Sequence, residues 1–219
     1  MSLDLYLQST IRKIIDDPEL LDSTVQRVSE KLGISYISEK EPEGNVCFIN
    51  SDEVRPEFRL SFSSTDLYDY LYAVLLSLPY PTQANEIDQT DVSRIPMPKD
   101  SSSFWRLVQL GKQLRQLHRL EDPVVNASIT LHSPDGNYVV YNIRHEWDRI
   151  YINDTTYFER VPEPVWHLYL GGYQPAQQWL HERLGHTLTG EDILQYQRII
   201  TALTHSLPLI AEIDRMVVE

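Results

Sequence analysis

The double glycine Gly171-Gly172 is the feature that most constrains how this chain folds. It separates a short apolar run that begins at Val165 from a segment that opens with Pro175. Adjacent glycines permit a sharp turn that residues with a side chain resist, and proline suits the first position of a helix because its missing N–H has no helical partner there. The pattern therefore predicts a strand, a tight turn and a helix that ends at Gly185.

A second helix is predicted directly afterwards. Thr189, followed by Glu191 and Asp192, has the composition of an N-terminal cap, because a hydroxyl accepts from the unpaired N–H groups of a first turn and acids favour that end of a helix. The region 165–214 is thus expected to form a compact scaffold that holds a few polar side chains in fixed places.

Helical spacing of apolar residues dominates the first half of the chain. The segment 64–78 is apolar nearly all round and is predicted to be buried, ending at Pro79. Strands are predicted at 33–38 and 45–50, with an ambiguous segment at 59–62. The predicted helices cover 4–15, 18–32, 64–78 and 101–118, the last of them capped by the serines at 101–103.

Beyond Glu121 the pattern changes to strands. Residues 127–132 and 138–143 flank the turn-forming Ser133-Pro134-Asp135-Gly136, which predicts a β-hairpin, and 149–153 is a further strand. Helices, then strands, then helices indicate an α+β fold with a helical N-terminal part, central mostly antiparallel strands and C-terminal helices.

The chain is expected to form one domain over 1–219, with two lobes (1–121 mainly helical, 122–219 strands then helices) as the alternative. Its opening Met1-Ser2-Leu3 resembles an artificial expression start. We therefore expect it to be a C-terminal part of a longer protein.

Charge and cysteine content limit the class of function. The 32 acids and 19 bases leave a formal net charge of −13, which argues against avid, sequence-blind nucleic-acid binding because such binding needs a cationic surface. A lone cysteine, Cys47, rules out an internal disulfide framework and fits a reducing compartment. No apolar run has membrane-spanning length and no signal peptide is evident, so we expect a cytoplasmic protein without a membrane partner.

Motifs for catalysis are not found. The eight glycines fit neither the Walker pattern nor GxGxxG, the two glycine-rich motifs that bind phosphate, and no serine lies in a GxSxG elbow. The sequence from His181 to His186 exceeds the zinc motif HExxH by one residue, and its second histidine follows Gly185. We expect no catalytic residue, metal site or cofactor in this chain. A hydrolase that uses clustered carboxylates stays an alternative, for which two acids must converge in a pocket.

Four segments, in order, resemble one known family. The chain is similar to the C-terminal specificity (target-recognition) region of type ISP restriction-modification enzymes and related N6-adenine DNA methyltransferases. The most specific part is the pattern VW…GGYQP…WL…R.G.TL. The matching segments are 66–77, 93–121, 149–188 and 191–214.

The resemblance implies a role in DNA recognition. In that family the region reads double-stranded DNA for the methyltransferase domain of the same polypeptide, which uses S-adenosylmethionine and lies outside this chain. The resemblance therefore implies a sequence-recognition domain that is not an enzyme by itself. The alternative is a structural or protein-interaction module of such a complex, with reduced or lost DNA binding, which the net charge of −13 favours.

Several positions depart from the family pattern. Family members commonly have lysine or arginine where this chain has His181, Leu184 and His186, and the acidic segment 80–93 contains no lysine or arginine. Each lost phosphate contact weakens DNA binding and flattens its salt dependence. Either the protein reads DNA with few backbone contacts and relies on its methyltransferase partner, or its DNA function has decayed.

The residues after the double glycine are the first DNA candidates. Gln174 has the amide that reads adenine through two hydrogen bonds, and Tyr173 has a hydroxyl for a phosphate. The alternative for Gln174 is a hydrogen bond to the backbone of its own loop. Trp166 and Trp179 are interpreted as core residues, because indoles at helix–strand junctions usually pack.

The remaining candidates are mostly cations. Arg183 either contacts phosphate or forms a helix salt bridge, and the basic side of 101–119 is either a solvated face or a surface that follows the DNA backbone. The further candidate DNA-contacting residues are His186, Tyr80, Arg94, Asn153, Arg106, Lys112 and Arg115.

Overall fold

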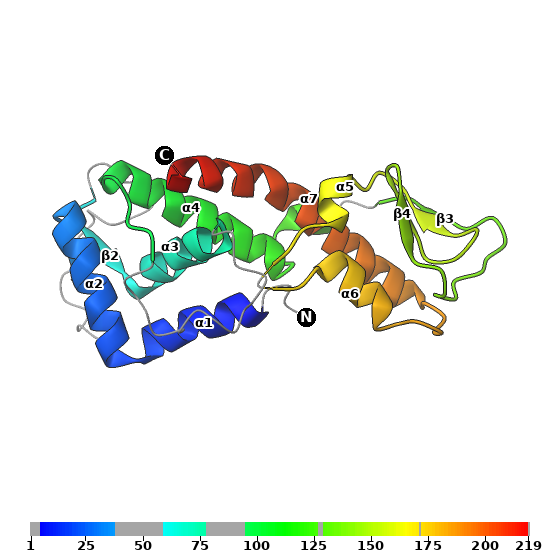
Figure 1. The fold of residues 1–219 in the computed structure, drawn as a ribbon, viewed down its shortest axis with the longest axis horizontal. Helices are drawn as coiled ribbons and strands as arrows, with labels where there is room; N and C mark the ends of the chain where they lie inside the picture. The colour runs from blue at the N-terminus through cyan, green and yellow to red at the C-terminus, as the bar shows by residue number, and fades with distance from the viewer. Residues whose placement is uncertain (1–4, 38–58, 78–94, 127–128, 171, 219) are drawn as a thin grey trace. The chain divides into compact units, whose positions relative to one another are not determined.

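The chain forms two compact units in the computed structural model (Figure 1). We call Leu5–Arg115 with Ile210–Glu219 the helical unit and Gln116–Leu209 the mixed unit. The residues that the structure describes are 5–37, 59–77, 95–126, 129–170 and 172–218.

The first two helices agree closely with their predicted ranges. Helix α1 spans Leu5–Asp16 and α2 spans Pro18–Leu32. The carboxylate of Asp17, between them, accepts from two backbone N–H groups of the first turn of α2, at 3.0 and 3.2 Å. Gly33 ends α2 in the left-handed conformation, with a φ of 66°. Both predicted helices are confirmed.

A short parallel pair of strands follows. Strand β1 (Ser35–Ile37) pairs with β2 (Ser61–Ser63), so that Tyr36 lies opposite Phe62. Phe62 is buried and packs at 5.5 Å against the ring of Phe104. The strand predicted at 33–38 is confirmed and the ambiguous segment becomes β2, whereas 45–50 lies outside the described residues.

The core of the helical unit contains α3 (Ser64–Ser77) and α4 (Ser101–His118). Eight consecutive or near-consecutive residues of α3 are buried, which confirms the prediction from its uniformly apolar sequence. The cap of α4 is Asp100, whose carboxylate accepts from the backbone N–H of Ser103 at 2.7 Å, and not a serine side chain as predicted. The acid suits this end of the helix dipole.

Helices α3 and α4 approach to backbone contact at Gly111. A Cβ atom at this position would lie 1.8 Å from the carbonyl oxygen of Asp69. One turn later along α4, Arg115 donates two hydrogen bonds to the Asp69 carboxylate, at 2.6 and 3.0 Å. The missing side chain thus permits the close crossing at which this ion pair forms.

The mixed unit contains a four-stranded antiparallel sheet in the order β3-β6-β5-β4. Ile150 and Phe158, opposite each other on neighbouring strands, are buried on one face of the sheet. Strand β4 and strand β5 form a hairpin whose two-residue loop is Trp147-Asp148. The strands are β3 (Leu131–His132), β4 (Arg144–Glu146), β5 (Arg149–Tyr151) and β6 (Tyr157–Phe158).

The hairpin predicted between 127–132 and 138–143 is wrong. Its turn forms, with Gly136 at a φ of 66°, but β3 pairs with β6 instead. The side-chain amide of Asn153 donates to the carbonyls of Asn137 and Val139 at 2.9 and 3.0 Å. These acceptors are therefore used by a side chain and not by a partner strand. Turn residues indicated the reversal, but pairing depended on a residue farther along the chain.

The strand predicted to begin at Val165 is also wrong. Residues Glu163–Trp166 form the short helix α5, which follows Pro162 and has a proline in its first turn. Proline lacks the N–H that a strand ladder needs but fits a first helical turn. Only Leu170 keeps a strand-like contact, an isolated bridge to Tyr173. Between them Gly172 has a φ of 93°, so the predicted tight turn is confirmed.

The last two helices are α6 (Pro175–His181) and α7 (Gly190–Val218). Pro175 opens α6 as predicted, but α6 ends before Gly185, which has a φ of 80° in the turn that follows. No helix among the described residues is both long enough and apolar enough to span a membrane. Helices together with a small antiparallel sheet confirm the α+β class.

Replacing Gly111 by alanine should destabilise the helical unit, because the added methyl group would overlap the backbone of α3. We expect the free energy of unfolding to fall by about 3 kcal/mol, the upper part of the range for overpacked sites. Urea denaturation followed by circular dichroism measures this change. Gly190→Ala is the matched control, since a Cβ atom there meets nothing within 4 Å, and stability equal to wild type for Gly111→Ala would contradict the close crossing.

Candidate nucleic-acid interface

The loop before α6 places Gln174 at the start of a helix. Leu170 and Tyr173 exchange backbone hydrogen bonds of 2.9 and 3.5 Å around Gly172, and Gln174 is the N-cap residue of α6. The Gln174 amide nitrogen donates to the carbonyl of His167 at 3.3 Å. The backbone-bonding alternative for Gln174 therefore occurs, through a single long hydrogen bond.

Helix α6 rests on a buried aromatic contact. The ring of Trp179 lies 4.9 Å from that of Tyr196 in α7, and the Tyr196 hydroxyl donates to the carbonyl of Ala176 at 2.9 Å. Burial raises the pKa of Tyr196 well above its usual range, so this hydroxyl keeps its proton. Gln177 donates to the carbonyl of Trp166 at 2.9 Å and joins α6 to α5. The first turn of α6 is thus held from two sides, and both tryptophans are buried, as predicted.

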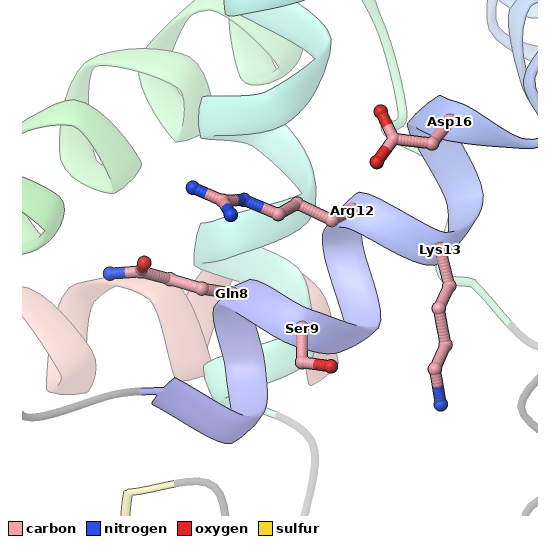
Figure 2. A pocket seen from close by; sticks show the side chains of 5 residues that line it. All are labelled: Gln8, Ser9, Arg12, Lys13 and Asp16. Atoms are coloured by element: carbon pink, nitrogen blue, oxygen red, sulfur yellow. The ribbon is translucent and has the colours of Figure 1, made fainter.

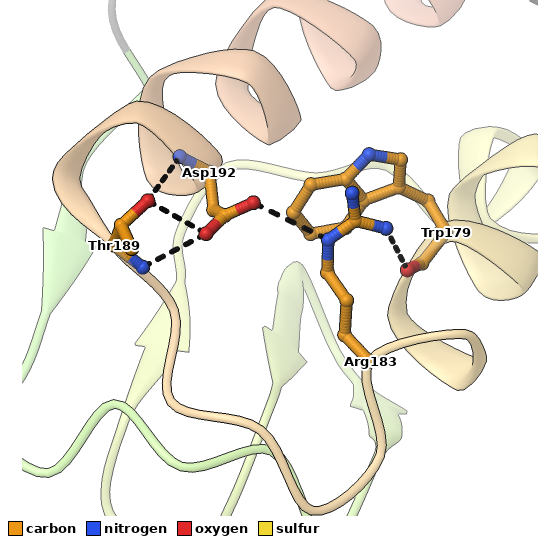
Figure 3. Close-up of polar contacts among 4 residues, drawn as sticks. All are labelled: Trp179, Arg183, Thr189 and Asp192. Atoms are coloured by element: carbon orange, nitrogen blue, oxygen red, sulfur yellow. Dashed lines mark hydrogen bonds and ion pairs between the residues drawn. The ribbon is translucent and has the colours of Figure 1, made fainter.

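Arg183 lies flat against Trp179, as Figure 3 shows, with its guanidinium carbon 3.6 Å from the ring centroid. It also donates to the Trp179 carbonyl at 3.0 Å and to the Asp192 carboxylate at 3.4 Å. The salt bridge expected for Arg183 therefore exists, but its partner is nine residues away on α7 and not one turn along the same helix. These contacts give Arg183 a stabilising role in the domain itself.

Asp192 connects this cluster to the start of α7. Its carboxylate accepts from the hydroxyl and the backbone N–H of Thr189 at 2.6 and 3.0 Å, and its own N–H donates to the Thr189 hydroxyl at 3.1 Å (Figure 3). This reciprocal arrangement is a capping box, which confirms Thr189 as the predicted cap. The hydrogen bonds from Thr189, followed by the contact with Arg183, lower the pKa of Asp192.

Asn153 is fully buried and all its polar side-chain atoms are used. Its amide nitrogen holds the segment 137–139, as described above, and its carbonyl oxygen accepts from the backbone N–H groups of Thr155 and Thr156 at 3.0 and 2.8 Å. The structure therefore places this DNA candidate inside the loop network, without accessible surface for a ligand.

Both arginines of α4 have carboxylate partners within the helical unit. Besides the Arg115–Asp69 pair, Arg106 lies 2.7 Å from Glu212, and this contact lowers the pKa of Glu212. Burial raises the pKa of Asp69, and the ion pair with Arg115 acts against that rise. Lys112 is exposed. Because the Arg115 pair is largely shielded from solvent, Arg115 supports the α3–α4 crossing more than it supplies a cationic surface.

The other candidates are distributed as follows. His186 is exposed, while its backbone carbonyl accepts from Val140 at 2.9 Å, so the segment 185–188 runs beside 138–140. Tyr173 is half-buried. Tyr80 and Arg94 lie outside the described residues. In the mixed unit the structure thus keeps Gln174, Tyr173 and His186 at the surface and assigns Arg183 and Asn153 to internal contacts.

The described residues offer little catalytic geometry. Among the described residues no group of three or more His, Cys, Asp or Glu side chains is placed to hold a metal ion. A shallow hollow on the surface of α1 is lined by residues of that helix, which Figure 2 labels. Its charged side chains are Arg12, Lys13 and Asp16, with a single carboxylate among the five lining residues. The converging carboxylates that the hydrolase alternative requires are not found in this hollow.

One surface was missed by sequence reasoning. The solvent face of the sheet carries, on directly opposed positions of four strands, His132, Tyr157, Tyr151 and Arg144. The first three rings are 4.9 Å apart in succession, and the Arg144 guanidinium lies 3.9 Å above Tyr151. The alternation of the apolar Ile150 and Phe158 with polar or tyrosine neighbours in 149–151 and 157–159 was the available signal, but only the strand order brings these residues together.

Arg183→Ala should lower the free energy of unfolding by about 1–3 kcal/mol, because it removes a charged hydrogen bond and the contact with the Trp179 ring. Arg183→Lys should recover less than half of the loss, since an ammonium cannot stack and donate in the same fork geometry. Urea denaturation measures both. The exposed Arg119, 3.8 Å from Glu121, is the control, and its alanine variant should remain within about 0.5 kcal/mol of wild type. Equal effects at the two arginines would contradict the assigned role.

Comparison with known proteins identifies the family. The Type ISP C-terminal specificity domain family matches residues 16–212. No curated protein matches the chain.

Three solved structures are similar. A nuclease-deletion mutant of the Type ISP restriction-modification enzyme LlaGI in complex with a DNA substrate mimic shows 20% identity and a TM-score of 0.43, over 68% of this chain and 13% of that one. The ATP-dependent Type ISP restriction-modification enzyme LlaBIII bound to DNA shows 19% identity and a TM-score of 0.45, over 72% of this chain and 11% of that one. The DrdV–DNA complex shows 16% identity and a TM-score of 0.48, over 69% of this chain and 18% of that one. The matched region thus covers less than a fifth of each of those chains. Because the family match extends over most of its length, this chain belongs to the Type ISP C-terminal specificity domain family.

Proposed function

We propose that this chain is a DNA sequence-recognition domain, which positions a duplex target for an S-adenosylmethionine-dependent adenine methyltransferase domain of the same polypeptide. The observation that carries the proposal is the family match over residues 16–212, which includes the loop and helix around Gln174. Similar proteins have been solved as complexes with DNA, which agrees with the proposal.

The geometry around Gln174 supports a reading role. Its side chain extends from a helix start that Tyr196 and Gln177 hold in place, and a rigid support is what base recognition requires. An amide reads adenine by donating to N7 and accepting from the N6 amino group in the major groove. The bond of Gln174 to the His167 carbonyl is 3.3 Å long and at the surface, so a base edge is able to replace it at small cost.

Electrostatics limits the strength of this interaction. The net charge is −13, and the candidate cations Arg106, Arg115 and Arg183 each have a carboxylate partner within the chain. Few phosphate contacts imply a shallow dependence of affinity on salt. We infer that the methyltransferase domain supplies most of the affinity and that this domain supplies sequence preference.

The proposed chemistry lies outside the chain. S-adenosylmethionine supplies the methyl group in the partner domain, which also extrudes the adenine from the duplex. The residues of this chain bind and orient the DNA.

The same ion pairs favour a second candidate function, a protein-interaction module without DNA binding. In that case the chain docks the methyltransferase domain but shows no salt-dependent shift of a DNA duplex. A pull-down with the methyltransferase domain, beside a DNA shift assay at low salt, separates the two functions.

Gln174→Ala should relax sequence preference at one base pair and leave the fold intact. We expect discrimination at that position to fall by about 1–3 kcal/mol, the contribution of a bidentate base contact. Binding of the full-length protein to a set of singly substituted duplexes measures this change. Gln178→Ala is the matched control, because Gln178 lies on the same helix and bonds Glu182 at 3.0 Å. An unchanged preference in Gln174→Ala would exclude Gln174 as a reader.

Cells that carry the intact gene should contain a methylated-adenine motif that disappears when the gene is deleted. Long-read sequencing of native DNA detects such a motif and defines the target duplex. A control strain with a substitution in the methyltransferase domain should lose the modification while the protein still binds DNA. A genome without a gene-dependent motif would contradict the proposed function.

A further inference from the structure

The tip of the β4–β5 hairpin exposes a tryptophan. Trp147 is 91% exposed, whereas the other tryptophans of the chain, Trp105, Trp166 and Trp179, are all buried. Glu146 and Arg149 pair across the hairpin, so Trp147 is the first residue of a two-residue loop. A large indole with almost all of its surface in water makes no contribution to the core, and interfaces are where such residues usually become buried.

The backbone at Trp147 is unfavourable for this residue. Its φ of 62° lies in the left-handed region, which a residue with a Cβ atom enters at a cost. Two-residue hairpin loops with positive φ at their first position favour glycine there. The most exposed aromatic side chain among the described residues thus lies at a position where glycine would suit the fold better. A local cost without a compensating contact inside the protein points to a contact outside it.

The solvent side of the hairpin presents two ordered guanidinium groups. Arg144 lies 3.9 Å above the ring of Tyr151, and Arg149 lies 4.6 Å above that of Tyr157. Nε of Arg144 donates to Glu146 at 2.8 Å and its Nη1 donates to the carbonyl of Asn153 at 3.1 Å. Arg149 is 3.5 Å from Glu159 and has 42% of its side chain exposed. Because stacking restricts both arginines before any partner arrives, less conformational entropy is lost when they bind.

The opposite side of the hairpin is fixed to the rest of the mixed unit. His145 stacks on Trp166 at 6.1 Å, and its Nε2 contacts the carbonyl of Val161 at 3.0 Å. Asp148, next to Trp147, accepts at its backbone carbonyl from the N–H of Val161 at 2.7 Å. Ile150 is completely buried. The tip therefore projects from a rigid support.

Charge at this tip differs from that of the chain as a whole. Glu146 and Glu159 are each within 3.5 Å of an arginine, while Asp148 in the loop is exposed. The two arginines of 144–149 balance its two acids, although the chain carries a net charge of −13. An acidic protein meets least electrostatic repulsion from DNA where nearby bases balance its acids. The hairpin offers such a place, together with arginine donors and a glutamate acceptor, the groups that recognise guanine and cytosine edges.

We propose that the β4–β5 hairpin enters the major groove of the target duplex, with Trp147 leading and Arg149 and Arg144 facing the base edges. A two-stranded ribbon fits the width of this groove. The inference rests on the proposed function and adds to it a second contact region, distinct from Gln174. Duplex DNA is the expected occupant because guanidinium donors and a carboxylate acceptor suit base edges.

Trp147→Gly separates binding from stability in the full-length protein. The melting temperature should stay the same or rise, because glycine relieves the positive φ. Affinity for the duplex identified by methylation mapping should fall about tenfold, as expected for the loss of an apolar contact to base edges in the major groove. Fluorescence anisotropy measures affinity and circular dichroism measures melting. Leu194→Ala, at an exposed apolar position on α7, is the control and should alter neither quantity.

Duplexes with uracil in place of thymine test the groove, since they lack only a methyl group of the major groove. Wild-type protein should lose affinity for such duplexes, and Trp147→Gly should lose less. If wild type binds and Trp147→Gly binds equally well, the hairpin proposal is overturned while the proposed function stands. If Trp147→Gly keeps its DNA affinity but loses protection of the hairpin from hydrogen exchange, the occupant is a protein domain, which also overturns it. If wild type binds no duplex, the proposed function itself fails.

Discussion

Tyr196 is the side chain on which the mixed unit depends. It is completely buried in α7, its ring packs 4.8 Å from Phe158 of the sheet and 4.9 Å from Trp179 of α6, and its hydroxyl bonds the carbonyl of Ala176. One residue thus joins the sheet and two helices through ring contacts and a shielded hydrogen bond. The two surfaces assigned to DNA, the loop at Gln174 and the β4–β5 hairpin, both extend from elements that this residue connects.

The acidity of the chain and its proposed role in DNA binding are reconciled by the use of its arginines. Arg115 and Arg183 stabilise helix contacts through carboxylates, and Arg144 and Arg149 are stacked on tyrosines of the sheet. The cations are therefore held in defined positions and do not form a diffuse basic surface. Such an arrangement favours selective contacts over general attraction to phosphate, because long-range attraction depends on net charge while base recognition depends on geometry.

Local signals predicted the helices well. The capping residue Thr189, Gly33 after α2 and the opening Pro175 act within one turn of the chain, so the residues that decide these boundaries are neighbours in sequence. Strand pairing was predicted poorly. The turn at Gly136 formed without the hairpin expected around it, because Asn153 occupies carbonyls that a partner strand would have used. The strand predicted to begin at Val165 is replaced by helix α5, because the prolines before Val165 suit a first helical turn and lack the N–H that a strand ladder needs.

The amino-acid sequence alone determined the α+β class, most helix boundaries, the turn at Gly172 and the place of Gln174 at a helix start, since these follow from propensities and caps that act over a few residues. Only the tertiary structure decided which polar residues are available to a partner. It buried Asn153, engaged Arg183 with Trp179 and Asp192, and brought His132, Tyr157, Tyr151 and Arg144 together across four strands. The physical reason is that burial, ion pairing and strand order join residues distant along the chain, and no local pattern specifies those partners.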